Sequence, residues 1–204
     1  MKAMRPTWVT VLLSGAAVLG YLGYRTLVAP EPVVTEEPSA AAAASAALAD
    51  SLPDLALVGL DGEPTLIASW AGQPMLINFW ATWCAPCLRE IPLLKQFQSD
   101  HEDIRVVGIA VDNFDPVQSF AAEMQFNYPV LVGQTDAMEA AAALGVTVLA
   151  LPITVFTDSA GAVLGIHTGE IHAEHLEDYR AVLADLGTGR ADREAARARL
   201  AARM

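Results

Sequence analysis

The sequence Phe79-Trp80-Ala81-Thr82-Trp83-Cys84-Ala85-Pro86-Cys87 joins a predicted buried strand to a predicted helix. Residues 75–81 form a nearly continuous apolar run, which is typical of a strand covered on both faces of its sheet. A helix is predicted from about residue 85 into the 90s. Cys84 then lies at the start of the helix, and Cys87 lies one turn further along on the same face.

The two cysteines of this motif are the only cysteines in the chain. Thiol–disulfide exchange needs a thiolate, whereas a free thiol with a pKa of about 8.5 is mostly protonated at neutral pH. The unpaired N–H groups and the positive dipole end of a helix N-terminus favour the thiolate form of Cys84. Pro86 suits an early helical turn, where its missing N–H is not needed. Cys87 is placed so that its sulfur can reach that of Cys84.

Two other uses of a cysteine pair lack their necessary partners in this sequence. A structural zinc site needs four ligands, which two cysteines cannot complete. A purely structural disulfide that closes so short a loop stabilises a fold little. The motif therefore predicts redox chemistry.

Alternating strand and helix patterns extend from the motif on both sides. A β-hairpin is predicted over residues 55–67, around a turn at Asp61-Gly62. We also expect strands at 104–111, 128–132, 153–157 and 162–167, and helices at 115–125, 136–144 and 173–186. This order predicts a three-layer α/β fold with a mixed central sheet, in a domain that spans residues 51–187.

Residues 1–25 have the pattern of a membrane anchor. Residues 7–24 carry no charge and would span about 27 Å as a helix, close to the ~30 Å hydrocarbon core of a bilayer. Lys2 and Arg5 outweigh the one cation that follows the run. We therefore expect a single-pass anchor in the cytoplasmic (inner) membrane, with the rest of the chain on the periplasmic or extracytoplasmic side. A cleaved signal segment is the alternative, because Ala-x-Ala sites occur around residues 40–49.

The segments on either side of the predicted domain differ from it in composition. Residues 26–50 are rich in Pro, Ala and Glu and are predicted to form a linker. Residues 188–204 carry five arginines against two acids. We expect this basic C-terminal tail to be helical and to form a frayed, solvated extension, with binding to an anionic membrane surface as the alternative.

Negative charge is concentrated in the middle of the chain, whose net formal charge is −12. Residues 31–187 alone carry −18. A body this acidic repels phosphate at long range, so a nucleic-acid partner is not expected.

The motif Trp80-Ala81-Thr82-Trp83-Cys84-Ala85-Pro86-Cys87, followed by Leu88-Arg89-Glu90-Ile91-Pro92, resembles the active-site signature of the TlpA/ResA family of membrane-anchored thioredoxin-like proteins. The resemblance covers about residues 50–187. It implies that Cys84 attacks a substrate disulfide, that Cys87 resolves the mixed disulfide, and that the two form the redox disulfide Cys84–Cys87.

The resemblance also assigns a role to a carboxylate. It implies that Glu90 tunes the acidity of the cysteines and helps to move protons. The alternative is that Glu90 is a solvated carboxylate in the first turn, favoured there by the helix dipole. Thioredoxins proper carry a buried aspartate six residues before the first cysteine, where this chain has Asn78. Asn78 cannot act as an acid or a base, so that task is left to Glu90.

Further substrate-contacting residues follow from the same resemblance. The thioredoxin fold places a cis-proline beside the cysteines, and the matching pair here is Leu151-Pro152. The family usually has Thr or Ser after this proline, whereas this chain has Ile153. Together with Leu151 and Pro152, Trp83 and Pro86 are expected to contact the substrate. For Trp83 the alternative is a partly buried ring that covers the helix start.

An insertion is the last structural feature that the resemblance implies. The segment from about residue 112 to residue 144 matches an extra helix and strand that the family inserts into the basic fold.

The function predicted from these features is a protein disulfide reductase that acts on exported proteins without a cofactor. By family analogy its clients are apocytochrome c or a respiratory copper-site protein, and a membrane reductant carrier of the CcdA/DsbD type supplies electrons. One alternative is a copper-binding metallochaperone, although such relatives typically have Cys-x-x-x-Cys. The other is a thiol peroxidase, although its Pro-x-x-x-Thr-x-x-Cys arrangement is absent. No metal site is predicted, and His167, His172 and His175 are expected at the surface.

Overall fold

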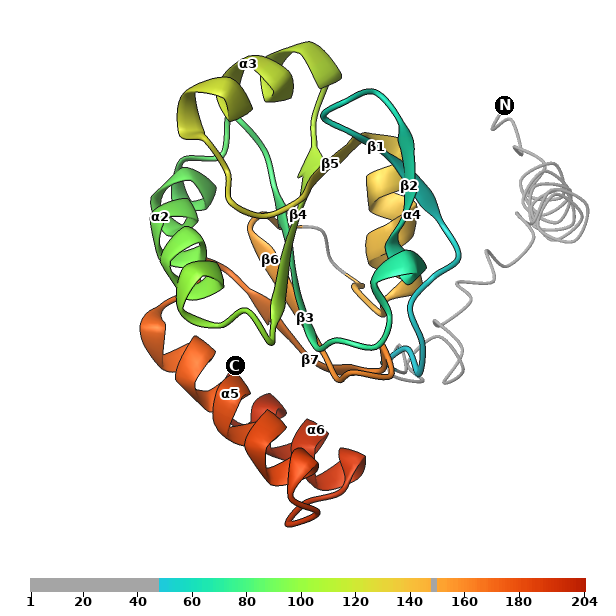
Figure 1. Ribbon diagram of the computed structural model, residues 1–204, viewed down its shortest axis with the longest axis vertical. Coiled ribbons are helices and arrows are strands. Elements are labelled where there is room, and N and C mark those ends of the chain that lie inside the picture. Colours follow the sequence, from blue (N-terminus) through green and yellow to red (C-terminus); the bar gives the residue numbers. More distant parts are fainter. Residues whose placement is uncertain (1–47, 148–149) are drawn as a thin grey trace, which may run out of the picture. The chain divides into compact units, whose positions relative to one another are not determined.

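A mixed β-sheet runs through the residues that the computed structural model describes, 48–147 and 150–204 (Figure 1). Within them seven strands pair in the order β2-β1-β5-β4-β3-β6-β7. The central strands β3, β4 and β5 are parallel, and the other pairs are antiparallel. The strands are β1 (Ala56–Gly59), β2 (Pro64–Leu66), β3 (Met75–Trp80), β4 (Arg105–Val111), β5 (Val130–Gly133), β6 (Ile153–Thr157) and β7 (Val163–Thr168).

Helices cover both faces of this sheet. On one face α2, α3, α5 and α6 contribute to a core that includes Ile91, Val117 and Tyr179. On the other face η1 and α4 pack over a second core that includes Ile67 and Ala140. The helices are η1 (Ile67–Trp70), α2 (Ala85–Asp100), α3 (Phe114–Met124), α4 (Thr135–Ala143), α5 (Ala173–Gly187) and α6 (Arg193–Ala201). The predicted three-layer α/β fold with a mixed sheet is confirmed.

The N-terminal β-hairpin is also confirmed. Its strands β1 and β2 are antiparallel, with Val58 opposite Pro64. The turn between them is closed by a hydrogen bond from the N–H of Gly59 to the carbonyl of Glu63. Gly62 lies in this turn with a φ of 83°, a left-handed conformation that favours glycine.

The segment expected to be an insertion forms α3, β5 and α4. β5 enters the sheet between β4 and β1, so it links the hairpin to the central strands. The ring of Trp80, at the end of β3, lies 5.5 Å from those of Phe120 and Phe126. Aromatic pairs at this spacing are stabilising, and this one holds α3 against the strand that leads to the cysteines.

The C-terminal segment differs from the expected frayed, solvated extension. Residues Arg193–Ala201 form α6, which packs against β7 and α5. Ala196 and Leu200 on its inner face are 1% and 0% exposed. Leu200 lies so close to β7 that a Cβ on Gly165 would come within 3.1 Å of it. The expectation was wrong because two buried side chains suffice to dock a short helix whose remaining residues are polar or small.

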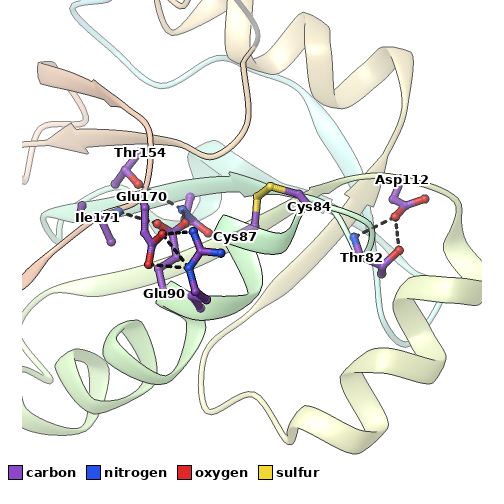
Figure 2. Close-up of a disulfide and its surroundings, with 10 residues drawn as sticks. Thr82, Cys84, Cys87, Glu90, Asp112, Thr154, Glu170 and Ile171 are labelled. Atoms are coloured by element: carbon purple, nitrogen blue, oxygen red, sulfur yellow. Dashed lines mark hydrogen bonds and ion pairs between the residues drawn. A yellow bond between two sulfur atoms is a disulfide. The ribbon is translucent and has the colours of Figure 1, made fainter.

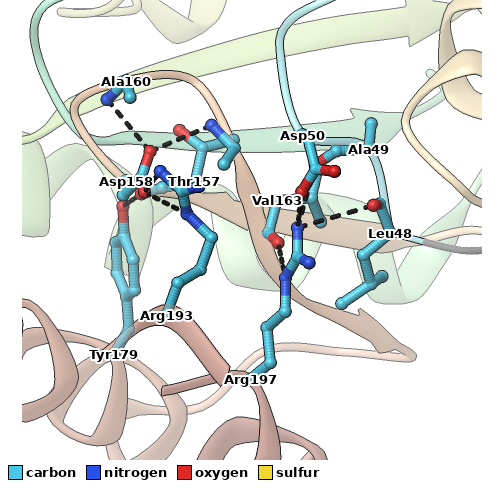
Figure 3. Close-up of polar contacts among 11 residues, drawn as sticks. Leu48, Ala49, Asp50, Thr157, Asp158, Ala160, Val163, Tyr179, Arg193 and Arg197 are labelled. Atoms are coloured by element: carbon cyan, nitrogen blue, oxygen red, sulfur yellow. Dashed lines mark hydrogen bonds and ion pairs between the residues drawn. The ribbon is translucent and has the colours of Figure 1, made fainter. Parts of the chain in front are cut away.

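Arginines of α6 also fix the helix to other elements by ion pairs. Arg193 pairs with Asp158, and Arg199 pairs with Asp185. The guanidinium of Arg197 bonds the carbonyls of Ala49 and Val163 and the carboxylate of Asp50 (Figure 3). The basic residues that suggested a membrane surface therefore bind partners within the chain.

The folded domain begins before residue 51. The N–H of Val163, at the start of β7, donates a hydrogen bond to the carbonyl of Ala49 (Figure 3). Residues 48–50, expected at the end of the linker, thus contact the domain. The expected anchor at residues 1–25 lies outside the described residues, among which no helix is long and apolar enough to cross a membrane.

Removal of the buried side chain of α6 tests its place in the fold. Leu200→Ala is expected to lower the free energy of unfolding by about 2–5 kcal/mol, because it removes packed methyl groups and leaves a cavity. The measurement is urea denaturation of the full chain. Ala198→Gln, on the exposed face of the same helix, is the control and should change stability by less than about 0.5 kcal/mol. Equal stabilities of wild type and Leu200→Ala would show that α6 is not part of the folded unit.

Candidate active site

A disulfide between Cys84 and Cys87 lies where β3 passes into α2 (Figure 2). Cys84 is the N-cap residue of the helix, and Pro86 stands in its first turn. The two Cα atoms are 5.3 Å apart. The strand–turn–helix arrangement expected from the sequence is present, and both cysteines lie at the positive end of the helix dipole.

The two sulfurs differ in their access to solvent. Cys84 is 5% exposed, whereas Cys87 is fully buried. The side chain of Trp83, directly before Cys84, is 70% exposed. The alternative in which Trp83 covers the helix start as a partly buried ring is therefore wrong. An attacking thiol can reach Cys84 only, beside a large apolar ring that is open to solvent.

The turn before the disulfide is fixed by a buried carboxylate that the sequence analysis missed. Asp112 accepts hydrogen bonds from the N–H of Thr82 at 3.0 Å and from the Thr82 hydroxyl at 2.5 Å (Figure 2). It also accepts one from the N–H of Asn113. Asp112 follows β4, which is parallel to β3, so the two carboxyl ends meet at one edge of the sheet. An acidic residue directly after a buried strand was the available signal.

Glu90 lies one turn beyond Cys87 and is 1% exposed. Asn78 Nδ2 donates a hydrogen bond to Glu90 Oε1 at 2.7 Å, and the N–H of Ile171 donates one to Glu90 Oε2 at 2.7 Å. The alternative of a solvated first-turn carboxylate is wrong, because the side chain points into the domain. Burial of a carboxyl with only two donors makes its charge state sensitive to its surroundings.

Burial raises the pKa of the Glu90 carboxyl to about 7. The hydrogen bonds from Ile171 and Asn78 act in the opposite direction, because they stabilise the ionised form. The nearby charge of Glu170 adds a smaller upward effect. A carboxyl that titrates near neutral pH can both accept and return a proton under physiological conditions.

Two contacts link this carboxylate to distant parts of the chain. Asn78 Nδ2 also donates to Thr154 Oγ1 at 3.1 Å, across the antiparallel pair of β3 and β6. The loop that carries Ile171 is held to α2 by an ion pair between Arg89 and Glu170 (Figure 2). The sequence analysis noted Asn78 only as a residue unable to act as an acid. No local pattern pointed to Ile171, because its contribution is a backbone N–H.

The peptide bond between Leu151 and Pro152 is cis, as the family resemblance implied. Pro152 is buried directly before β6, and its carbonyl accepts a hydrogen bond from the N–H of Gly169. Ile153 pairs with Phe79 in β3, which places this segment at the same end of the sheet as the cysteines. Leu151, like Pro86 in the first turn of α2, is half-buried.

The histidines form a cluster that was not expected. His167 is 7% exposed, so its prediction as a surface residue was wrong, whereas His172 is exposed. The rings of His167 and His175 are 4.1 Å apart, and that of His172 is 5.8 Å from His175. Desolvation lowers the pKa of His175. Among residues 48–147 and 150–204, no group of three or more His, Cys, Asp or Glu side chains is arranged to hold a metal ion.

A thioredoxin-like fold with a disulfide at a helix N-terminus defines a thiol–disulfide oxidoreductase. The Redoxin family model matches residues 47–183. A thiol-disulfide oxidoreductase ResA from Geobacillus kaustophilus is 30% identical over 172 residues, which cover 83% of this chain and 90% of the relative. The chain belongs to the Redoxin family, and its similarity to ResA proteins confirms the TlpA/ResA resemblance.

Solved structures agree with this classification. A thiol:disulfide interchange protein of the thioredoxin family from Chlorobium tepidum superposes with a TM-score of 0.58 and 26% identity, over 67% of this chain and 96% of that one. A secreted Mycobacterium tuberculosis disulfide oxidoreductase gives a TM-score of 0.54 and 26% identity, over 64% of this chain and 96% of that one.

The pKa of Glu90 predicts a pH dependence of stability. The carboxyl titrates near 4.5 in the unfolded chain and near 7 in the folded one, so the folded state binds the proton more tightly. Proton binding by Glu90 therefore contributes about 3 kcal/mol to the free energy of unfolding. This contribution is fully present below about pH 4.5 and is lost as the pH rises to about 7. Urea denaturation at several pH values measures it.

Glu90→Gln should remove this decline between pH 4.5 and 7, because the amide does not titrate. Glu177→Gln replaces an exposed carboxylate on α5 and serves as the matched control, which should keep the decline. A wild-type profile that is unchanged in Glu90→Gln would contradict the raised pKa.

Proposed function

We propose that this chain is a protein disulfide reductase in which Cys84 attacks and Cys87 resolves. The Cys84 thiolate attacks one sulfur of a substrate disulfide, which breaks that S–S bond and releases the other sulfur as a thiolate. Cys87 then attacks Cys84, releases the second substrate thiol and closes the Cys84–Cys87 disulfide. The substrate gains two electrons and two protons, and the chain loses them. The observation that carries the proposal is this disulfide at the start of α2.

The difference in burial supports this division of roles. Cys84, with 5% of its surface exposed, is the sulfur that another polypeptide can approach. Its position as N-cap of α2 favours the thiolate, which is the reactive form. Cys87 is 0% exposed, so its sulfur can react only with a partner already bound to Cys84.

Glu90 supplies the proton transfer that the resolving step needs. A fully buried thiol must lose its proton before it attacks, and water does not reach it. Glu90 lies one helical turn from Cys87 and titrates near pH 7, so it takes the proton when the mixed disulfide is resolved and returns one when the disulfide is reduced again.

The substrate chain lies across Trp83, Pro86, Leu151 and Pro152. These residues come from the start of α2 and the entry to β6, at the same end of the sheet as the disulfide. The exposed ring of Trp83 offers apolar contact area, and the half-buried side chains of Pro86 and Leu151 supply smaller contacts.

The cellular setting is part of the proposal. Residues 1–25 anchor the chain in the inner membrane through the uncharged run 7–24, and the catalytic domain faces the periplasm. Clients are exported proteins, such as apocytochrome c or a copper-site protein, and a carrier of the CcdA/DsbD type returns electrons. The description of the M. tuberculosis neighbour as secreted supports an exported site of action.

Substitution of each cysteine tests the division of roles. Cys84→Ser should abolish reduction of insulin disulfides, because the remaining thiol, that of Cys87, is fully buried. Cys87→Ser should accumulate mixed disulfides, because the captured client cannot be released. Non-reducing electrophoresis of a membrane fraction detects these species, and mass spectrometry identifies the client. Full turnover by Cys84→Ser would refute the mechanism.

Trp83→Ala tests the docking surface. Loss of an exposed aromatic anchor is expected to raise KM for insulin about tenfold, which corresponds to about 1.4 kcal/mol of binding free energy. Reduction of a small aromatic disulfide should change little, because it does not span the surface. Met138→Ala, at another exposed apolar residue, is the control and should leave both substrates unaffected. Equal KM values for Trp83→Ala and wild type would exclude the ring from docking.

A further inference from the structure

The side-chain amide of Asn78 is fully buried between Glu90 and Thr154. Its Nδ2 donates to Glu90 Oε1 at 2.7 Å and to Thr154 Oγ1 at 3.1 Å, so both amide hydrogens are used. Its Oδ1 is buried and has no hydrogen-bond partner among the described residues. In this arrangement Asn78 is a donor toward Glu90, which suits an ionised carboxylate.

Protonation of Glu90 creates a conflict with this arrangement. Both carboxylate oxygens face donors, Asn78 Nδ2 on one side and the N–H of Ile171 on the other. Each oxygen keeps a second lone pair that can take the proton, but the new O–H then needs an acceptor, and both groups bonded to Glu90 are donors. The N–H of Ile171 belongs to the backbone and cannot become an acceptor. A buried O–H without an acceptor is unfavourable, so a proton carrier in this position needs a partner that can change.

We propose that Asn78 is a positioning residue whose side-chain amide turns by half a rotation each time Glu90 gains or loses its proton. In the rotated state Oδ1 occupies the place of Nδ2. It accepts one hydrogen bond from the Glu90 O–H and one from the Thr154 hydroxyl, which can donate as well as accept. No covalent bond of Asn78 changes. The inference rests on the proposed function, in which Glu90 carries a proton to and from Cys87.

The two states are balanced in their hydrogen bonds. In both, Glu90 and Thr154 are each bonded to Asn78, so the rotation gives up neither of these bonds. In the observed state the other end of the amide, Oδ1, has no partner among the described residues, so no hydrogen bond at that end opposes the rotation. Aspartate at this position would place a second negative charge beside Glu90. Leucine could form a hydrogen bond with neither the ionised nor the protonated form of Glu90.

The other groups near Glu90 cannot replace Asn78 as a hydrogen-bond partner that changes with the protonation of the carboxyl. Glu170 is engaged by Arg89, and its charge acts on Glu90 without a hydrogen bond. Burial raises the pKa of Tyr128, so its phenol stays neutral at physiological pH. In the oxidised chain, in which the rotation is tested, the sulfur of Cys87 is in the disulfide and carries no proton. Asn78 is thus the one described side chain that bonds Glu90 directly.

Nuclear magnetic resonance of the oxidised full chain tests the rotation without any substitution. The asparagine side chains are labelled with ¹⁵N and the glutamate carboxyls with ¹³C, and the chain is titrated from pH 5 to pH 9. The Asn78 amide signals should shift with the same midpoint as the Glu90 carboxyl. Nuclear Overhauser contacts from the amide hydrogens to the Thr154 methyl should be present above that midpoint and lost below it. Contacts that persist on both sides would overturn the rotation.

Asn78→Leu separates positioning from packing. In this variant the ionised form of Glu90 loses a charge-assisted hydrogen bond, whereas the protonated form loses only a weaker, neutral one. The ionised form is therefore destabilised more, and the titration midpoint of Glu90 should rise by about one pH unit. The pH profile of insulin reduction should move by the same amount. Asn127→Leu, at an exposed asparagine before β5, is the control and should leave both midpoints in place.

The two proposals fail differently. An unshifted Glu90 midpoint in folded Asn78→Leu would overturn the positioning role, while reduction by Cys84 and Cys87 would still stand. Full insulin reduction by Cys84→Ser would instead overturn the proposed function, and the positioning role with it. Because the wild-type titration needs no variant, the rotation stays testable if Asn78→Leu does not fold.

Discussion

The buried carboxylate of Glu90 is the constraint on which the site depends. It lies on α2, receives one hydrogen bond from β3 and another from the loop before α5, and so joins three segments distant in sequence. Desolvation alone would favour the protonated, neutral carboxyl. The two hydrogen-bond donors alone would keep the carboxylate ionised. Their opposition leaves the pKa at about 7, where a small change nearby alters the charge. The packing of the domain thereby sets the chemistry of its active site.

Burial also orders the steps of disulfide exchange. In the proposed mechanism the exposed ring of Trp83 meets a partner first and the edge of Cys84 comes next, whereas Cys87 and Glu90 are fully buried. A client therefore cannot react with the second sulfur before the first. Asp112 accepts two hydrogen bonds from Thr82 and so fixes the turn that leads to Cys84.

Most of the fold could be predicted because its strands and helices are encoded by local patterns. The predicted strands and helices are found within two residues of their expected bounds. The helical character of the C-terminal tail was expected, but the docking of α6 was not, because only Ala196 and Leu200 mark its inner face and its ion pairs join residues far apart in sequence. The cysteines and Glu90 could be placed from their spacing. The bonds of Glu90 to Asn78 and Ile171 could not, because they depend on how separate elements pack.

The place where the chain enters the domain has a geometrical consequence for a tether. Ala49 is hydrogen-bonded to Val163, at the start of β7, whereas Thr168, at the end of β7, pairs with Ile153 beside the active-site end of β3. Entry and disulfide therefore occupy opposite poles of the sheet. The proposed anchor and the proposed client site therefore adjoin the domain at different ends of the sheet.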